Sequence, residues 1–336
     1  MVVFPRSLAP LALLLVAASP APANEAQAML ASLQAMDARV AAIGHRLAVA
    51  SADFCDAPVQ RAGFLVHDLS QYAPETRSDA ATLFGLGAWP AVLAVAPDSA
   101  AARAGLRIGD AIVAIDGRAP PEPPEDADDK ATFGRVAAIE PMIEAALADG
   151  DLSLTIERDG EQRQLAIAGD PGCATRFQVE PGERINASAD GTYVKLSSAV
   201  VDFARNDDEL ALIIAHEFSH NILRHRETLD AQGVSRGLFR AFGKNPGRIR
   251  ATENEADRLA LHLMARAGFD IRVAPAFWDR FGRETGAGIF SDGTHAGRRD
   301  RIALARSEIA LIEAQRLRGE QPTPDFGRSS PPASPR

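Results

Sequence analysis

The segment His216-Glu217-Phe218-Ser219-His220 has residue types and a spacing that suit hydrolytic chemistry. On a helix, His216 and His220 lie about 40° apart around the axis and one turn apart in height, so their imidazoles can share one metal ion. Glu217 projects about 100° from His216, where its carboxylate can reach a water on that ion without binding the ion itself. The spacing therefore predicts two zinc ligands and a general base.

A helix that starts at Asn206 is expected to carry these residues. Asn206 and Glu209 form the pattern of a capping box, and the apolar residues 210–214 lead directly into the motif. On a continuing helix, His225 would point away from the two ligand histidines. We therefore predict a surface or capping role for His225.

A catalytic zinc site needs a third protein ligand and leaves the fourth position to water. The candidate lies 33 residues after His220, in the segment TENEAD at 252–257. Glu253 and Asp257 share one helix face at positions i and i+4, so one can bind the ion while the other orients a ligand imidazole. Glu253 is the predicted ligand and Asp257 the supporting carboxylate. Glu255 points away from that face and is the competing ligand.

These segments resemble metallopeptidase family 48, which includes the CAAX prenyl endoprotease and a periplasmic protease that assists outer-membrane protein assembly. The resemblance spans about residues 176–316 and rests on the segments 185–201, 207–225, 253–261 and 294–302. It implies one zinc ion held by three side chains, a base and a supporting carboxylate: His216, His220, Glu253, Glu217 and Asp257. It also implies that Asn186-Ala187 and the strand after Gly191 hold the substrate in extended form.

The late motif of the family, Thr-His-Pro followed by Arg-Ile, appears as Thr294-His295-Ala296 and Arg301-Ile302. The resemblance implies that His295 and Arg301 donate to the oxyanion of the tetrahedral intermediate. Alternatively, His295 occupies the open position of the zinc ion in a resting state. A loop histidine and a salt-bridging arginine remain the plain alternative, and Ala296 in place of proline leaves the loop geometry open.

Residues 55–175 have a different sequence pattern, in which short apolar runs are separated by Gly and Pro. The string VLAVAPDSAAARAGLRIGDAIVAIDG at 92–117 resembles a bacterial-type PDZ domain, and the resemblance covers about residues 60–170. Phe84-Gly85-Leu86-Gly87 is similar to the carboxylate-binding loop of such domains, which receive the C-terminus of an extended peptide. An ordinary turn before a strand explains the same four residues equally well.

The composition of the two ends of the chain predicts a signal peptide at the start and a disordered tail at the end. Residues 1–23 combine Arg6, a short apolar stretch and Ala-Pro-Ala, which predicts a secretory signal peptide cleaved after Ala23, with an uncleaved anchor as the alternative. The amphipathic stretch 24–54 predicts a helix, and the Pro- and Ser-rich tail 319–336 predicts disorder. In an oxidising compartment Cys55 and Cys173 can form one disulfide, or remain two buried thiols.

The 336 residues carry a formal net charge of -9, which argues against nucleic-acid binding through the phosphate backbone. We predict an α+β multidomain protein, in which a PDZ-like domain at 55–175 precedes a mainly helical zinc metallopeptidase domain at 176–318 with a small edge-strand sheet. The predicted function is a periplasmic or secreted zinc endopeptidase that acts on unfolded or misassembled envelope polypeptides. The basic segment 231–250 is expected to be a connecting loop, a lid or a peripheral membrane contact. The alternative function is a non-proteolytic chaperone or peptide-binding module with structural zinc.

Overall fold

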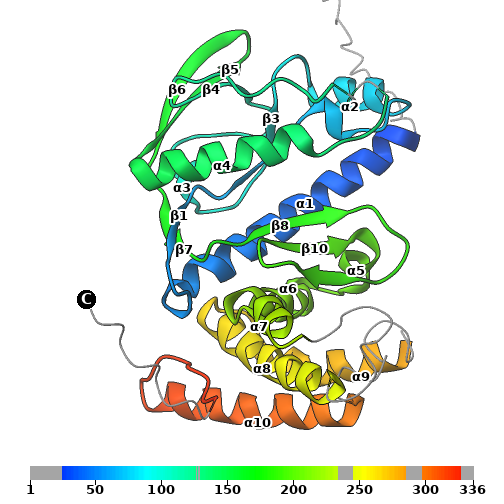
Figure 1. The fold of residues 1–336 in the computed structure, drawn as a ribbon, viewed down its shortest axis with the longest axis vertical. Coiled ribbons are helices and arrows are strands. Elements are labelled where there is room, and N and C mark those ends of the chain that lie inside the picture. The colour runs from blue at the N-terminus through cyan, green and yellow to red at the C-terminus, as the bar shows by residue number, and fades with distance from the viewer. Residues whose placement is uncertain (1–24, 126, 128, 234–244, 285–296, 327–336) are drawn as a thin grey trace, which may run out of the picture.

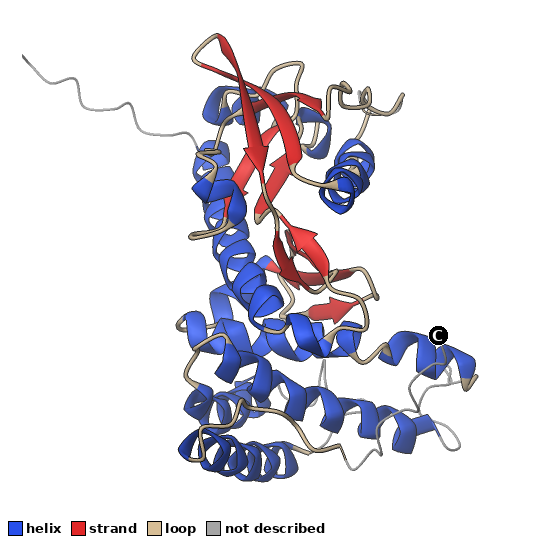
Figure 2. Ribbon diagram, turned by 90° about the vertical axis from the view of Figure 1, so that its left-hand side faces the viewer, coloured by secondary structure: helices blue, strands red, loops and turns tan. Residues whose placement is uncertain are grey.

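The computed structural model describes residues 25–125, 127, 129–233, 245–284 and 297–326. The predicted signal peptide, most of the segment 231–250 and His295 therefore lie outside the described residues. Within them, the order of elements confirms the predicted α+β class: a strand-rich part comes first and a mainly helical part follows (Figures 1 and 2). No helix in the described ranges combines the length and apolar character that crossing a membrane requires.

The first helix, α1 (Glu25–Ala50), runs diagonally between the two parts (Figure 1). Its buried residues Val40, Ile43 and Leu47 belong to the hydrophobic core of the helical part. Toward the strand-rich part, Gln34 donates to the carbonyl oxygen of Leu93 at 3.2 Å. The helix predicted for this region is therefore a structural element of both parts.

The strand-rich part has its own core, separate from that of the helical part. Five antiparallel strands form its sheet in the order β2-β3-β4-β5-β6, so β2 is an edge strand. These strands are β2 (Phe64–His67), β3 (Ala91–Val95), β4 (Ala111–Ile115), β5 (Leu152–Arg158) and β6 (Glu161–Ile167). The helices of this part are α2 (Arg77–Phe84), α3 (Ala100–Arg103) and α4 (Gly134–Asp149), with 3-10 turns at Ala52–Phe54 and Leu69–Gln71.

The chain enters and leaves the strand-rich part at one place. Strand β1 (Val59–Arg61) pairs antiparallel with β7 (Asp170–Gly172), so that Val59 lies opposite Gly172 and Arg61 opposite Asp170, more than 100 positions away in sequence. Beside this pair, a disulfide joins Cys55 to Cys173. Of the two sequence alternatives, the structure contains the bridge rather than two separate thiols.

The helical part contains a small three-stranded sheet and a layer of packed helices. The sheet order is β8-β10-β9, in which β10 (Tyr193–Ser197) runs parallel to β8 (Arg176–Glu180) and antiparallel to the edge strand β9 (Ala187–Ala189). The helices are α5 (Ser198–Phe203), α6 (Asp207–Ile222), α7 (His225–Ala231), α8 (Asn245–Arg266), α9 (Ala274–Glu284) and α10 (Arg298–Leu317), with a 3-10 turn at Ile271–Val273.

Helix α6 lies at the centre of this core because its sequence is apolar on nearly every side. All residues from Glu209 to Ser219 are buried. The helix begins as predicted: the side chain of Asn206 accepts a hydrogen bond from the amide of Glu209 at 2.9 Å. Residue 216 and its neighbours are therefore carried on a rigid element.

Residues 319–326 lie against helices α8 and α10, where the sequence predicts disorder from Gly319 onward. Arg266 donates to the carbonyl oxygen of Pro322 at 2.7 Å, and Gln315 donates to that of Thr323 at 2.8 Å. Phe326 packs against the core. The prediction is wrong for these residues because the helices satisfy the backbone of the proline-rich stretch, while 327–336 lie outside the described residues.

Candidate active site

Three side chains converge where α6 packs against α8. The Nε2 atoms of His216 and His220 are 3.4 Å apart. Glu253 places Oε2 at 3.3 Å from His216 Nε2 and Oε1 at 3.6 Å from His220 Nε2. Tetrahedral ligands about 2.0–2.1 Å from a zinc ion stand about 3.3–3.4 Å from one another. These donor atoms therefore fit a zinc ion, and the three residues are the ones that the sequence singles out.

A second carboxylate, that of Asp257, contacts His216 at Nδ1, the ring nitrogen on the side away from Glu253. Asp257 Oδ1 lies 2.9 Å from Nδ1 of His216. Asp257 is itself paired with Arg301, whose Nε donates to Oδ2 at 2.7 Å. Burial raises the pKa of Asp257, but Arg301 and His216 together hold it below its ordinary value. An ionised Asp257 fixes the tautomer and orientation of His216, which is the supporting position predicted for it.

The structure places Arg301 differently from the predicted oxyanion donor. Its guanidinium is buried between Asp257 and Trp278, 3.4 Å from the centre of the indole ring. It approaches His216 from the Nδ1 side, at 3.5 Å, whereas Nε2 is the atom that faces His220 and Glu253. Arg301 is therefore a positioning residue in this arrangement. The other predicted oxyanion donor, His295, lies outside the described residues.

Glu217 is buried beside the ligand residues, with 6% of its surface exposed. Burial raises its pKa; the charge of His216 lowers it and that of Glu253 raises it, with a net value of about 7. A carboxylate with a pKa near the working pH can both take up and release a proton. The environment of Glu217 therefore suits the predicted general base.

The carboxylates around His216 favour its protonated form. Burial lowers the pKa of His216, but hydrogen bonds to Asp257 and Glu253 outweigh it and raise the pKa to about 10. The two carboxylates thus strongly stabilise a positive charge between helices α6 and α8. Because a zinc ion supplies that charge, metal binding and loss of this proton are coupled.

His225 belongs to the site, contrary to its predicted surface or capping role. Its side chain is buried, and its Nδ1 lies 3.0 Å from Nδ1 of His220. Its Nε2 lies 3.1 Å from Oε2 of Glu255. Glu255, the competing ligand of the sequence analysis, therefore contacts this histidine and is not one of the three converging ligand residues.

The edge strand β9 packs beside α6, and its outer edge is not paired with another described strand. Asn221, one residue after His220, accepts from the amide of Gly191 at 2.8 Å and contacts the carbonyl oxygen of Tyr193 at 3.4 Å. The β9–β10 turn is thus fixed to the end of the motif helix. This places an open strand edge close to the ligand residues, in the region for which the family resemblance implies substrate binding.

The predicted carboxylate-binding loop lies at the end of a helix. Phe84 is the last residue of α2 and its ring packs on His67 and Tyr72. Gly85 caps the helix in the left-handed conformation, with φ 64°, and Leu86 is buried. None of the residues 84–87 lines a cavity described for the structure. The segment forms a turn at the end of α2, as the ordinary-turn alternative expects, and the peptide-binding role of residues 84–87 stays a prediction.

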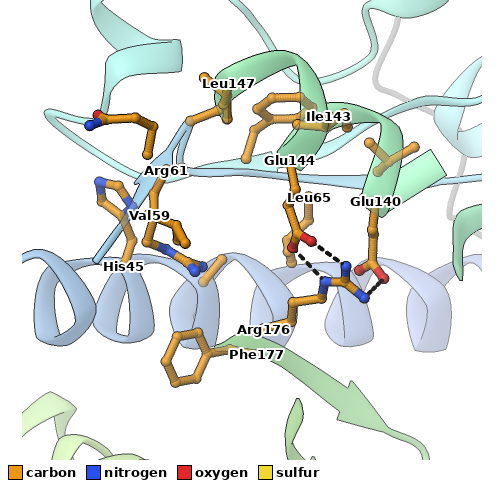
Figure 3. Close-up of a pocket in the computed structure, with 16 residues that line it drawn as sticks. His45, Val59, Arg61, Leu65, Glu140, Ile143, Glu144, Leu147, Arg176 and Phe177 are labelled. Carbon is orange, nitrogen blue, oxygen red and sulfur yellow. Dashed lines mark hydrogen bonds and ion pairs between the residues drawn. The ribbon is translucent and has the colours of Figure 1, made fainter. Parts of the chain in front are cut away.

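A cavity does lie on the strand-rich part, between the edge strand β2 and helix α4 (Figure 3). Leu65, Ile143 and Leu147 provide apolar lining. Arg61 and His45 also line it; Arg61 Nε and His45 Nδ1 are buried and lack a hydrogen-bond partner among the described residues. The Nε–H of the Arg61 guanidinium, buried and without an acceptor among the described residues next to an apolar hollow, suits an anionic group attached to an apolar one.

One side of this cavity is closed by a charged cluster that joins the two parts of the molecule (Figure 3). Arg176, at the start of β8, donates to Glu144 of α4 at 2.8 and 2.6 Å and lies 3.1 Å from Glu140. Tyr193 of β10 also donates to Glu140. The cluster therefore ties α4 directly to the sheet that packs beside α6.

Comparison with known proteins agrees with the geometry of both parts. Residues 157–247 match peptidase family M48, and residues 92–131 match the PDZ domain family. The M48 match thus follows the PDZ match along the chain, and we refer to the strand-rich part, which contains the PDZ match, as the PDZ region. The M48 match includes His216, Glu217 and His220 and ends before Glu253, so the third ligand is assigned from the geometry.

Several curated proteins are similar to this chain over part of its length. It is 27% identical over 157 residues to mitochondrial metalloendopeptidase OMA1 of Saccharomyces cerevisiae, which covers 41% of this chain and 42% of the relative. It is 30% identical over 151 residues to a putative beta-barrel assembly-enhancing protease of Vibrio cholerae, covering 36% and 31%. The beta-barrel assembly-enhancing protease of Escherichia coli K12 is 30% identical over 133 residues, covering 31% and 27%. The chain thus spans less than half the length of the relatives it matches.

Proposed function

We propose that this protein is a zinc-dependent endopeptidase of the cell envelope that cleaves unfolded or misassembled polypeptides. The observation that carries the proposal is the convergence of His216, His220 and Glu253 at the separations of a tetrahedral zinc site, with Glu217 buried beside them. A structural zinc site normally has four protein ligands and has no use for a buried base. The M48 match and the relatives named as metalloendopeptidase or protease support the same activity.

The mechanism assigns one task to each residue. Bound zinc would polarise the scissile carbonyl and lower the pKa of the attacking water. Glu217 takes a proton from that water as the new C–O bond forms, and it gives the proton to the leaving amine as the C–N bond breaks. The open edge of β9 holds the substrate backbone in extended form.

Peptide recruitment is proposed for the cavity between β2 and α4. In PDZ domains an extended peptide adds a strand to an exposed sheet edge, and β2 is such an edge strand. Arg61 lies where the C-terminal carboxylate of the added strand would need a cation, and the apolar hollow would take its last side chain. A peptide with a free, apolar C-terminus is therefore the proposed ligand of this part, and a periplasmic or secreted location is proposed for the whole protein.

The test is cleavage of unfolded casein by the purified full-length protein, with and without a chelator. Glu217→Gln should abolish cleavage, because an amide cannot accept the proton of water, while zinc content stays that of the wild type. Glu227→Gln is the matched control, since Glu227 is an exposed residue that pairs with Arg224 at the surface; it should cleave normally.

Two outcomes would contradict the proposal. Full activity of Glu217→Gln would remove the base from the mechanism. Suppression of casein aggregation without any fragments, in wild type with zinc bound, would favour the non-proteolytic chaperone.

A further inference from the structure

The two ligand imidazoles have polar partners at their Nδ1 atoms, on the side away from the three converging donor atoms. His216 meets the carboxylate of Asp257 there, whereas His220 meets another imidazole, that of His225, at 3.0 Å. The two rings of this pair are nearly perpendicular, at 74°, with centres 4.9 Å apart. A nitrogen-to-nitrogen distance of 3.0 Å between buried rings is a hydrogen bond only if one nitrogen carries a proton and the other does not.

The proton positions follow from the chemistry of the three groups. For His220 to offer the lone pair of Nε2 to a metal ion, its neutral ring must carry the proton on Nδ1. Nδ1 of His225 must then accept this hydrogen bond, which leaves the proton of the second ring on Nε2. That nitrogen lies 3.1 Å from Glu255 Oε2, which accepts it. Every donor in the series thus meets an acceptor.

The backbone explains why His225 can reach His220 although it is five residues away. On a continuous helix the two side chains would point about 140° apart. Helix α6 instead ends at Ile222, and Arg224 takes a left-handed conformation with φ 51° before α7 begins at His225. A left-handed conformation is uncommon for a residue with a side chain. This turn carries His225 back toward the ligand.

From this geometry we infer that His225 and Glu255 form a positioning pair that fixes the tautomer and ring orientation of the zinc ligand His220. The inference rests on the proposed function, because it assumes that His220 binds zinc. It adds two residues to the site, neither of which is a ligand. Loss of such an outer partner typically lowers metal affinity 10- to 100-fold.

The decisive measurement is the zinc dissociation constant of the full-length protein, determined by competition with a chromophoric chelator. His225→Phe keeps a ring but removes both nitrogens, so we expect zinc binding about 10- to 100-fold weaker. His225→Gln retains a carbonyl oxygen that can accept from His220 and should recover part of the affinity. Glu255→Gln retains an acceptor for His225 and should cause a smaller loss than His225→Phe.

A second readout separates positioning from a general effect on folding. Cobalt(II) bound in place of zinc has visible absorption bands that depend on the geometry of its ligands, and these bands should shift in His225→Phe. The control is His262→Phe, which removes another fully buried histidine that pairs with a carboxylate, Glu308 at 2.7 Å, outside the three-ligand cluster. That variant should lose stability but keep the cobalt spectrum and the zinc affinity of the wild type.

The outcomes distinguish this inference from the proposed function. Wild-type zinc affinity and cobalt spectrum in His225→Phe would overturn the inference and leave the zinc enzyme intact. Absence of zinc binding by wild type would overturn the proposed function itself. If His225→Phe does not fold, Glu255→Ala decides: unchanged zinc affinity in that variant rejects the pair, and weaker binding with a shifted cobalt spectrum supports it.

Discussion

The two ligand histidines are held by partners of different charge. His216 faces Asp257, which is ionised and paired with buried Arg301. His220 faces the ring of His225, whose pKa is lowered, mainly because the ring is buried. An anionic partner makes an imidazole a stronger donor to a metal ion, and a neutral partner does so less. The site therefore combines one strongly and one weakly polarised imidazole with the charged ligand Glu253.

The proposed binding of a peptide C-terminus in the cavity of the PDZ region depends mainly on a single residue, Arg61. Burial lowers the pKa of Arg61 only to about 10, so the guanidinium stays charged at neutral pH. Arg61→Gln should weaken binding of a peptide with a free apolar C-terminus about 10- to 100-fold, as expected for loss of a charge-assisted hydrogen bond of about 1.5–3 kcal/mol. Fluorescence anisotropy with a labelled peptide measures this change.

The control for this prediction is Arg103→Gln, which removes an arginine that is mostly exposed and pairs with Asp170 at 2.6 Å. It should bind the peptide as wild type does. Amidation of the peptide should weaken binding to wild type but have little effect on Arg61→Gln. Equal affinity of free and amidated peptides for wild type would show that Arg61 does not receive a carboxylate.

At the scale of elements, the sequence predicts the motif helix and the strand–helix order of both parts because those signals are local. The cap at Asn206, the apolar run after it and the i, i+4 pair Glu253 and Asp257 depend only on neighbouring residues. The break after Ile222 carries no such signal, since no Gly or Pro marks it. Helical spacing continued beyond Ile222 therefore predicts the wrong direction for the side chain of His225.

The segment predicted as a carboxylate-binding loop shows the same limit of local signals. A Gly-Leu-Gly segment predicts a turn, and the turn exists at Gly85. Which turn faces a cavity depends on how β2 and α4 pack, and these elements lie about 70 residues apart in the sequence. Local sequence thus locates the turns but does not identify which one lies beside the groove that tertiary packing creates.

Helix α1 provides a pH-sensitive contact between its own surface and the small sheet. The carboxylate of Asp37 accepts from the amide of Val179 in β8 at 3.1 Å. Burial raises the pKa of Asp37 from 3.8 to about 7, although this hydrogen bond lowers it. The folded state therefore binds a proton more tightly than the unfolded state. Its contribution to stability is complete below about pH 4 and is lost as the pH rises toward 7.

Asp37→Asn should remove this pH dependence, because the amide oxygen still accepts from Val179 but carries no charge. We expect the melting temperature of the variant to exceed that of wild type at pH 8 and to approach it at pH 3.5, below the unfolded pKa, measured by circular dichroism. Asp207→Asn serves as the control, since its carboxylate is mostly exposed and pairs with Arg39 on the same helix α1. A difference between Asp37→Asn and wild type that is equal at both pH values would contradict the assignment.

At the scale of the whole molecule, the two large hydrophobic cores of the described residues are joined by α1, by the β1–β7 pair and by the cluster around Arg176. The PDZ region is inserted between α1 and β8, yet these two elements pack against each other in the core of the helical part. Folding that core must therefore bring together segments separated by more than 100 residues. The Cys55–Cys173 disulfide joins the chain at the two ends of this insertion.

The disulfide should accordingly stabilise the helical part, although it encloses the PDZ region. Closing a loop of about 100 residues costs the unfolded chain about 4–5 kcal/mol, and the bridge removes this cost. Trp89 lies in the PDZ region and Trp278 in the helical core, so Trp89→Phe leaves one fluorescent reporter for the latter. In that background, the double variant Cys55→Ser, Cys173→Ser should have a free energy of unfolding of the helical core about 2–4 kcal/mol lower than with the disulfide. The measurement is urea unfolding followed by the fluorescence of Trp278. The smaller value applies if β1 and β7 stay paired during the transition, since they already hold the ends of the insertion together. The Trp89→Phe protein with its disulfide reduced should behave like the double serine variant. If the urea transition followed at Trp278 is the same with and without the disulfide, the bridge stabilises only the PDZ region.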